Sequence, residues 1–323
     1  MPTVLKTDAA LVPFGEPQRG LLAEHGLELI ERPCVTEEEL VEHGRGADAL
    51  MVVAEPVTAR VIEALDGLRV ITRFGAGLDN VDIEAATRAG VQVTYVPGAS
   101  VEEVSDHTIA MIFSLARGLP VLDAAVRRGD WAIPADLPPL RRMRGQVLGI
   151  VGVGRIGGAV ARKAQALGLE TVAFDPHASA ASLAELGVES LPLDDLLARA
   201  DHVSVHTPLT PETHHLIGAR ELALMKPTAT IVNVARGGVV DQAALAEALA
   251  AGHLRGAGVD VQEQEPPPAD EPLLGLPNVI LTPHAAHYSQ ESMDDLRQAA
   301  IEDVAAVLHG REPRFPVNET AAA

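Results

Sequence analysis

The 323-residue chain is poor in cysteine and in aromatic residues. Its one cysteine, Cys34, cannot form an intrachain disulfide. This excludes a disulfide-stabilised secreted fold and any zinc site that needs several cysteines. The aromatic side chains are five Phe, two Tyr and one Trp. They are too few for the mixed aromatic and basic surface on which single-stranded nucleic acids stack.

Positive charge and long apolar runs are scarce as well. Lys and Arg total 25 against 45 Asp and Glu, so the formal net charge is −20. Because a negative field repels phosphate backbones and anionic lipid headgroups, we expect no nucleic-acid and no membrane partner. No apolar run reaches the ~18 residues of a membrane span, and the first residues lack the basic and apolar regions of a signal peptide. We therefore expect a cytoplasmic protein.

The chain does have the composition of a globular protein. Hydrophobic residues make up 47% of it and charged residues 22%, which excludes an intrinsically disordered chain. At roughly 100–200 residues per domain, the length indicates two domains.

Apolar runs rich in β-forming residues alternate with longer segments of helical periodicity along the whole chain. This alternation is typical of βα units and parallel sheets, so we predict an α/β fold. The first series of predicted strands comprises 3–7, 27–31, 49–54, 69–73 and 91–95. The second series comprises 147–151, 170–174, 202–206, 229–234, 256–261 and 278–282. Six strands in this second series suit a nucleotide-binding sheet.

Two long helices are predicted from capping signals and apolar stripes. The capping-box pattern Ser100-Val-Glu-Glu103 precedes a stripe that ends at Gly118, and a second stripe from Met293 to Leu308 precedes Gly310. Residues 120–144, which carry Trp131, are predicted to be irregular. We expect this stretch to be a surface loop that covers a domain face rather than a nucleic-acid patch.

A glycine-rich turn carries the strongest signal for a cofactor. The segment Gly152-Val-Gly154-Arg155-Ile156-Gly157 matches G-x-G-x-x-G between a predicted strand and a helix. In that context backbone N–H groups and the helix N-terminus can hold a pyrophosphate. Asp175 ends the next predicted strand, where a carboxylate would accept hydrogen bonds from ribose hydroxyls and repel a 2′-phosphate. These features predict NAD rather than NADP as the cofactor.

Polar side chains follow three later strands of the second series, at the sheet edge where open α/β sheets bind ligands. Arg236 follows the fourth strand, and its guanidinium fork can grip a carboxylate. His284 follows the sixth strand, and an imidazole exchanges protons near neutral pH. Glu263 and Glu265 both follow the fifth strand, and their spacing alone does not tell which one is the acidic partner of the histidine.

No metal site is expected. His202 and His206 lie four residues apart on one predicted strand, a separation of ~13 Å that excludes a shared ion. The pair His214-His215 is expected to have no cysteine or carboxylate cluster around it.

With these segments the chain resembles the D-isomer-specific 2-hydroxyacid dehydrogenase family over essentially its whole length. The matching segments are Arg73-Phe-Gly-Ala-Gly77-Leu-Asp-Asn80, Ser100-Val-Glu-Glu-Val-Ser-Asp-His107, the glycine turn with Asp175, His206-Thr-Pro-Leu-Thr-Pro-Glu-Thr213, Asn233-Val-Ala-Arg236-Gly-Gly238, Asp260 to Pro266, and Thr282-Pro-His284. Within the family, the run from Pro283 to Glu291 is most similar to the branch of the C-terminal-binding proteins.

The resemblance implies a fold of two domains. A flavodoxin-like substrate domain would comprise residues 1–98 and 288–323, with a Rossmann NAD-binding domain, residues 99–287, inserted into it. The resemblance also implies that Arg236 binds the substrate carboxylate and carbonyl, that His284 is the acid/base, and that Glu265 is its acidic partner.

The resemblance further implies the binding residues. Substrate contacts would come from Arg73, from the backbone N–H groups of Ala76 and Gly77, and from His287. Cofactor contacts beyond the glycine turn and Asp175 would come from Thr108, Thr207, Pro208, Thr213, Ala235, Asp260 and Ala286.

Two departures limit what is carried over from the family. His287 stands where the C-terminal-binding branch has a tryptophan over the substrate, so the substrate of that branch is not carried over. Formate-oxidising members have glutamine where this chain has Glu265, which favours a ketone or alcohol reaction with proton transfer.

We therefore expect an NAD(H)-dependent oxidoreductase that interconverts a small 2-oxo acid and its D-2-hydroxy acid. Two alternatives are an NAD(H)-sensing binding protein of the C-terminal-binding type and a phosphoglycerate-type dehydrogenase. By analogy we also expect a homodimer, formed through the helix after Ser100 and the loop that carries Trp131.

Overall fold

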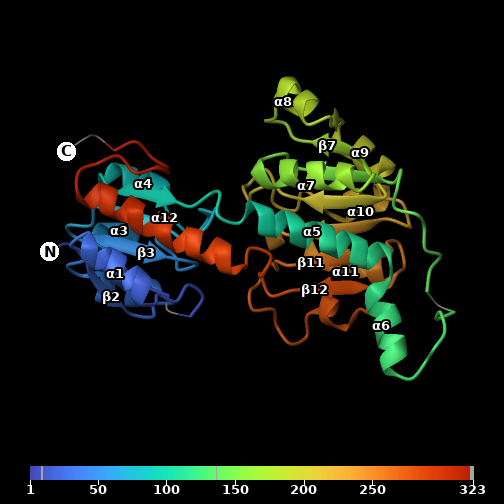
Figure 1. Ribbon diagram of the computed structural model, residues 1–323, viewed down its shortest axis with the longest axis horizontal. Helices are drawn as coiled ribbons and strands as arrows, with labels where there is room; N and C mark the ends of the chain where they lie inside the picture. The colour runs from blue at the N-terminus through green and yellow to red at the C-terminus, as the bar shows by residue number, and fades with distance from the viewer. Residues whose placement is uncertain (9, 136, 321–323) are drawn as a thin grey trace. The chain divides into compact units, whose positions relative to one another are not determined.

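The chain divides into two compact units in a computed structural model that describes residues 1–8, 10–135 and 137–320 (Figure 1). One unit is formed by Met1–Ser100 with Ser289–Ala323, and the other by Val101–Tyr288. The first unit is thus built from both ends of the chain, and the second is inserted into it. Among the described residues, no single helix is long and apolar enough to span a membrane. In the same residues, only the bent pair Val101–Ala116 and Leu119–Arg127 has that length and apolar character when the two helices are taken together.

The sheet of the first unit has five parallel strands in the order β2-β1-β3-β4-β5. The strands are β1 (Thr3–Lys6), β2 (Glu28–Glu31), β3 (Ala49–Val52), β4 (Val70–Arg73) and β5 (Gln92–Tyr95). This is the strand order of flavodoxin, as predicted. Its switch point lies between β1 and β3, where successive connections leave for opposite sides of the sheet.

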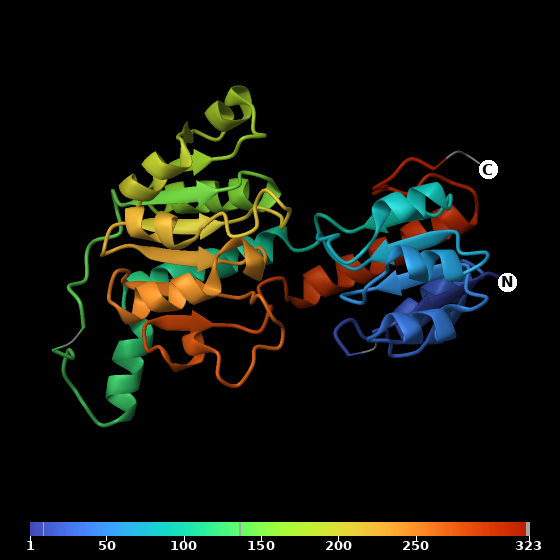
Figure 2. The same cartoon turned by 180° about the vertical axis from the view of Figure 1, so that it is seen from behind.

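Helices cover both faces of this sheet (Figures 1 and 2). They are α1 (Glu16–Glu24), α2 (Glu37–Gly44), α3 (Ala59–Ala64), α4 (Ile83–Arg88) and α12 (Gln290–Leu308). Neighbouring residues of a strand point to opposite faces. Accordingly, Val4 clusters with α1 and α12, whereas Leu5 clusters with α2, α3 and α4.

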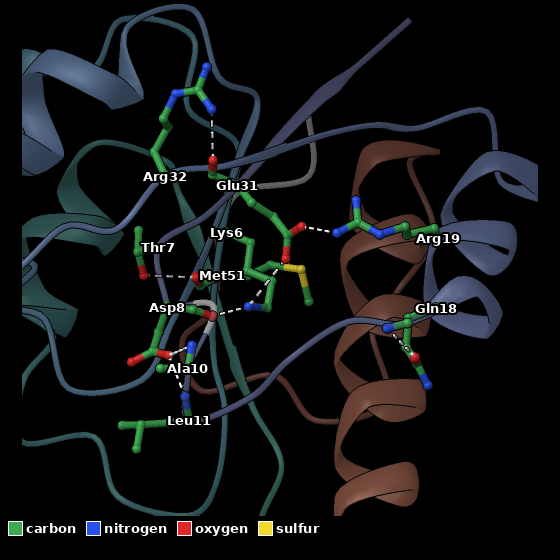
Figure 3. A network of polar contacts seen from close by, with 11 residues as sticks. Lys6, Thr7, Asp8, Ala10, Leu11, Gln18, Arg19, Glu31, Arg32 and Met51 are labelled. Carbon is green, nitrogen blue, oxygen red and sulfur yellow. Dashed lines mark hydrogen bonds and ion pairs between the residues drawn. The ribbon is translucent and has the colours of Figure 1, made fainter.

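A buried lysine anchors the carboxyl end of β1 (Figure 3). Lys6 has no exposed surface, and its Nζ donates to the carbonyl of Asp8 and lies 3.6 Å from Oε1 of Glu31. The same Nζ lies 4.9 Å from the ring centroid of Phe14. Burial lowers the pKa of Lys6, although the charges of Glu31 and Asp8 act to raise it. These contacts tie the loop between β1 and α1 to the sheet.

The sheet of the second unit has seven parallel strands in the order β12-β11-β10-β9-β6-β7-β8. The strands are β6 (Val147–Val151), β7 (Glu170–Phe174), β8 (Glu189–Ser190), β9 (His202–Val205), β10 (Thr230–Asn233), β11 (Gly256–Val259) and β12 (Val279–Leu281). Counted from β6, this is the Rossmann order 3-2-1-4-5-6 extended by one strand. The predicted α/β fold class is confirmed.

Helices cover both faces of the second sheet too. They are α5 (Val101–Ala116), α7 (Arg155–Ala166), α8 (Ala180–Glu185), α9 (Leu193–Arg199), α10 (Ala219–Leu224) and α11 (Gln242–Ala250), with short 3-10 turns at Gly237–Val239 and Pro272–Gly275. In β6, Leu148 and Ile150 cluster with α5, α7 and α8. Val147 and Val151 point the other way and cluster with α9, α10 and α11.

Two elements differ from the prediction. Part of the stretch expected to be irregular forms helix α6 (Leu119–Arg127). Pro120 lies in its first turn, where a missing N–H and a fixed φ are tolerated, so this proline does not break the helix. Gly118 caps the helix with a φ of 63°, which lets the chain turn between α5 and α6. The second difference is β8, two exposed residues with no apolar pattern to predict them.

Candidate active site

The predicted catalytic side chains follow three strands that lie side by side. Strands β10, β11 and β12 are neighbours in the sheet, and their ends lead to Arg236, Glu265 and His284 respectively. Because parallel strands end at the same edge, the three residues come from one edge of the second unit.

His284 and Glu265 form a direct hydrogen-bonded pair. Nδ1 of His284 lies 2.8 Å from Oε2 of Glu265, and the two side chains are 40% and 39% exposed. The other carboxylate oxygen, Oε1, accepts the backbone N–H of Gln262 at 2.9 Å. With the Nδ1 proton donated to the carboxylate, Nε2 is the ring nitrogen that can exchange a proton with a ligand.

The environment of Glu265 favours its ionised form. Burial raises the pKa of this carboxyl group. The hydrogen bonds from His284 and Gln262 and the positive charges of His284 and Arg236 outweigh burial, so the pKa of Glu265 lies below its ordinary value. An ionised carboxylate at this position selects the Nδ1–H tautomer of the imidazole.

The backbone of His284 is in the left-handed region, with a φ of 53°. Residues other than glycine adopt this conformation only where surrounding contacts hold it. The ring of His287 lies edge-to-face with the ring of His284, with the centroids 6.2 Å apart and an interplanar angle of 82°. The structure therefore brings His287, a predicted substrate contact, next to the predicted acid/base.

The loop of Arg236 packs directly on the loop that leads to Glu265. The backbone of Arg236 is held by the side-chain amide of Asn233, which donates to the Arg236 carbonyl at 2.9 Å. A Cβ on Gly237 would lie 2.0 Å from the carbonyl carbon of Gln262, so only glycine permits this approach. Contact between the two loops fixes the backbone next to Arg236 relative to the chain that leads to Glu265.

The structure separates the two glutamates that spacing left open. Glu265 contacts His284, whereas Oε1 of Glu263 lies 3.0 Å from Nε2 of His215. Oδ2 of Asp241 lies 3.8 Å from Nδ1 of the same ring. Two carboxylates thus lie near His215, which the sequence did not reveal because the loops that carry them are distant in sequence. Among the described residues, no group of three or more His, Cys, Asp or Glu side chains could hold a metal ion.

The glycine turn joins β6 to α7, and α7 begins with Arg155 and Ile156. Gly152 has a φ of 93°. A Cβ on Gly157 would lie 2.1 Å from the carbonyl oxygen of Gly152, so the helix can start this close to the strand only with glycine. By contrast, a Cβ on Gly154 would meet no atom within 4 Å, which leaves the space above the turn open.

Asp175 follows β7 and stabilises the turn from the side. Its Oδ2 accepts the backbone N–H of Val153 at 2.7 Å. Its Oδ1 accepts the backbone N–H groups of His177 at 2.8 Å and Ala178 at 3.1 Å. The carboxylate is thus held beside the glycine turn, as a group that binds the ribose of a dinucleotide must be.

The other predicted cofactor contacts also lie in the second unit. Thr108 lies on α5, and the rest follow strand ends of the sheet: Thr207, Pro208 and Thr213 after β9, Ala235 after β10, Asp260 after β11 and Ala286 after β12.

One of these residues, Thr207, has a buried hydroxyl group without a hydrogen-bond partner among the residues described. Leaving a buried hydroxyl unpaired costs free energy, which a bound ligand can recover. The residues present therefore fit a dinucleotide.

Arg73, Ala76 and Gly77 belong to the first unit. Arg73 ends β4, and the loop that follows it starts a left-handed turn at Gly75, whose φ is 109°. A Cβ on Gly75 would lie 2.2 Å from Nη1 of Arg73, so the guanidinium folds back against this loop. The backbone groups of Ala76 and Gly77 and the Arg73 side chain thus share one strand end.

Two polar side chains near His284 were not predicted as site residues. Nε2 of His107, on α5, lies 3.1 Å from Oγ1 of Thr282, and this hydroxyl donates to Oδ1 of Asp260 at 2.5 Å. Both residues lie in segments that carry the family resemblance, but their spacing in the sequence, 175 positions, hides the contact.

Comparison with known proteins identifies the family. The model of the NAD-binding domain of D-isomer-specific 2-hydroxyacid dehydrogenases matches residues 109–286. A glyoxylate reductase of Korarchaeum cryptofilum is 41% identical over 312 residues, which cover 94% of this chain and 93% of that protein. The chain belongs to the D-isomer-specific 2-hydroxyacid dehydrogenase family.

Several other relatives of this dehydrogenase are longer, and this chain spans 50–60% of their length. A D-3-phosphoglycerate dehydrogenase of Archaeoglobus fulgidus is 37% identical over 307 residues, but these cover 95% of this chain and only 58% of the relative. Among solved structures, D-lactate dehydrogenase of Aquifex aeolicus complexed with NAD and lactic acid aligns with a TM-score of 0.85 and 28% identity. That alignment covers 95% of this chain and 96% of the Aquifex chain.

The family match settles the role of the second unit. This dehydrogenase is an oxidoreductase of an NAD-dependent family, and its Rossmann unit is an NAD-binding domain, as predicted. The family acts on small 2-oxo and 2-hydroxy acids.

Proposed function

We propose that this dehydrogenase reduces a small 2-oxo acid to the D-2-hydroxy acid with NADH, and catalyses the reverse oxidation with NAD. The observation that carries the proposal is the pair of His284 and Glu265, 2.8 Å apart, which follow strands β12 and β11 next to strand β10, the strand that leads to Arg236. An acid/base, its carboxylate and a cation for the substrate thus derive from one sheet edge.

Each of the three side chains has a distinct task in this proposal. Bound NADH supplies the hydride that reduces the carbonyl carbon. His284 donates its Nε2 proton to the carbonyl oxygen, and Glu265 stabilises the ring while it carries the positive charge. Arg236 binds the substrate carboxylate and stabilises negative charge on the carbonyl oxygen. In the reverse direction His284 takes the hydroxyl proton as a base.

The proposed cofactor site has NAD rather than NADP as its ligand. The glycine turn would hold the pyrophosphate, and Asp175 would bind the ribose hydroxyls and repel a 2′-phosphate. The unpaired hydroxyl of Thr207 and the open space above Gly154 support this assignment. Thr108, Pro208, Thr213, Ala235, Asp260 and Ala286 are proposed as further contacts.

For the substrate we propose Arg73, the N–H groups of Ala76 and Gly77, and His287 as additional contacts. The position of the His287 ring against His284 supports its part in the substrate pocket. The glyoxylate reductase that this chain matches over 93% of that protein's length supports a small 2-oxo acid. The phosphoglycerate dehydrogenase named above supports a phosphorylated substrate as a second candidate. Its phosphate would need cations of the first unit, where Arg45, Arg60 and Arg73 are available.

The test is to follow NADH absorbance with glyoxylate, pyruvate, phenylpyruvate and a phosphorylated 2-oxo acid, using the wild type and His284→Ala. We expect turnover with one class of these acids. We expect the variant to lose about 10²- to 10⁴-fold in kcat, while its Kd for NADH stays within threefold, because only proton transfer is removed. Unchanged turnover in His284→Ala would contradict the proposed role. No turnover by the wild type, together with NADH-dependent capture of a protein partner, would favour a sensing protein instead.

A further inference from the structure

A buried carboxylate holds the turn that carries His284. Asp260 follows β11 and is 1% exposed. Its Oδ1 accepts the Thr282 hydroxyl at 2.5 Å and the backbone N–H of Ala285 at 2.9 Å, and its Oδ2 accepts the N–H of Ala286 at 3.0 Å. The N–H of His284 donates to the backbone carbonyl of Asp260 at 2.7 Å. One residue thus binds four donors within the five-residue turn 282–286.

This turn needs such support because of its backbone. His284 has a φ of 53°, a conformation that costs free energy for a residue with a side chain. The direction of the imidazole follows from this backbone. A shift of even part of an ångström in the turn moves Nε2 relative to a bound substrate, and misplacement on that scale reduces rates steeply.

The support extends to helix α5 through Thr282. A hydroxyl has one proton, and that of Thr282 is donated to Asp260. Nε2 of His107, 3.1 Å from the same oxygen, must therefore be the donor to Thr282. The same nitrogen lies 4.0 Å from Oδ1 of Asp260. A continuous chain of polar contacts thus runs from His107 through Thr282 to Asp260 and the His284 turn.

We infer that His107 and Thr282 are positioning residues for His284, acting through Asp260. The inference rests on the proposed function, since it assumes that His284 is the acid/base. It assigns a task to two side chains that touch neither the glycine turn nor the Glu265 carboxylate in the contacts described.

A purely structural role for the chain of contacts is the competing explanation, and the protein contains a matched control for it. Oγ1 of Thr230 lies 2.8 Å from Nδ1 of His202, and both residues are buried. Thr230 begins β10, whereas Thr282 directly follows β12. One threonine–histidine pair therefore lies at the amino ends of the strands and the other at their carboxyl ends. Loss of either hydroxyl breaks a pair of the same chemistry, but only one pair leads to His284.

The test compares Thr282→Val with Thr230→Val, since valine keeps the shape of threonine and removes its hydroxyl. We expect Thr282→Val to lose about tenfold to hundredfold in kcat, with Kd for NADH within threefold, and Thr282→Ser to recover most of the loss. Thr230→Val should keep kcat within twofold, even if its melting temperature falls as much as that of Thr282→Val. Equal kcat in the two valine variants, or a loss confined to NADH affinity, would overturn the inference.

His107 is tested by the same logic. A glutamine side chain at this position would present an amide donor where Nε2 stands, so His107→Gln should keep most of kcat. His107→Leu offers no donor and should lower kcat in the direction of Thr282→Val. A His107→Leu enzyme with wild-type kcat and KM would overturn the part assigned to this residue.

An activity-independent measurement separates this inference from the proposed function. Long-range ¹H–¹⁵N spectra report the tautomer of each histidine, and the signals of His284 are those absent from His284→Gln. We expect a single Nδ1–H tautomer in the wild type and in Thr230→Val, and a mixture in Thr282→Val. If the wild type reduces no 2-oxo acid, the proposed function fails, but the spectra still decide whether Thr282 positions the ring. Identical spectra for Thr282→Val and the wild type would count against it.

Discussion

His202 illustrates how burial of a single side chain shapes the behaviour of this dehydrogenase. This residue begins β9. Both ring nitrogens are hydrogen-bonded, Nδ1 to Oγ1 of Thr230 at 2.8 Å and Nε2 to Oε1 of Gln146 at 2.9 Å. Burial lowers the pKa of His202 to about 4, with the charges of Arg255 and Lys226 acting in the same direction and Asp201 opposing them. The fold thus requires a neutral ring, while the unfolded chain protonates the same ring near pH 6.5.

We predict that His202 makes the protein acid-sensitive between pH 6.5 and pH 4. In this window His202 binds a proton in the unfolded chain but stays neutral in the folded protein, so the free energy of unfolding falls as the pH falls. The loss from this residue reaches on the order of 3 kcal/mol near pH 4. Urea unfolding of His202→Gln at pH 7, 6 and 5 should therefore show a smaller decrease with falling pH than the wild type. The exposed residue His253 provides the control, and equal pH slopes for His253→Gln and His202→Gln would count against the prediction.

The loops at the carboxyl edge of the second sheet act as a packed element rather than as independent connections. Gly237, in the 3-10 turn after β10, lies against the backbone that joins β11 to Glu265. The next residue, Gly238, has more room, because a Cβ there would meet the side chain of Leu209 at 3.4 Å. Two adjacent glycines thus have different tolerances.

Gly237→Ala should separate the loops of Arg236 and Glu265. The new methyl group would lie 2.1 Å from the Gln262 carbonyl oxygen, so the backbone must move. We expect kcat to fall by about 10²-fold or more and the free energy of unfolding by about 1–3 kcal/mol. Gly238→Ala should retain kcat within a few-fold. Steady-state kinetics and urea unfolding of both variants provide the measurement, and similar kcat values for the two would refute the packing argument.

The glycine turn offers a second matched pair at the scale of one element. Gly157→Ala should impair both stability and NADH binding, since its methyl group would collide with the Gly152 carbonyl. Gly154→Ala should fold normally, because its φ is −78° and nothing lies within 4 Å of the new atom. If the pyrophosphate occupies that open space, this variant should bind NADH at least about tenfold more weakly. Wild-type affinity in a fluorescence titration of Gly154→Ala would argue against the assigned pyrophosphate site.

At the scale of the whole molecule, exposed apolar side chains gather on and after α6. Leu119 is 53% exposed, Val126 49%, Trp131 90% and Ile133 79%. Exposed large apolar residues in one segment mark a surface suited to a protein partner. We propose that a second copy of this chain covers them, in the homodimer expected by analogy.

The dimer predicts a mass of about twice 33.9 kDa in light scattering coupled to gel filtration. Replacing Trp131 and Ile133 together by serine should shift the protein toward the monomer, because the interface loses its apolar contacts. Leu167→Ser, at an apolar residue that is 46% exposed at the end of α7, serves as the control and should leave the mass unchanged. A concentration-independent monomer in the wild type would contradict the proposal.

The sequence by itself determined the features that depend on neighbouring residues. Short apolar runs rich in β-forming residues located all the strands but β8, because strands of a parallel sheet that is covered on both faces are apolar along much of their length. The glycine turn was recognisable because its function requires glycines at fixed spacing between a strand and a helix. Arg236 and His284 were recognisable because each directly follows a strand, and parallel strands end at one edge.

Only the tertiary structure decided which side chains meet across the chain. The residue spacing left Glu263 and Glu265 equivalent, and the path of the loop brings one to His215 and the other to His284. The pair of His107 and Thr282 was equally hidden, since it depends on how α5 packs on the sheet. Periodicity specifies the face on which a residue lies, but contacts between distant segments depend on strand order, register and loop conformation. These are properties of the folded chain.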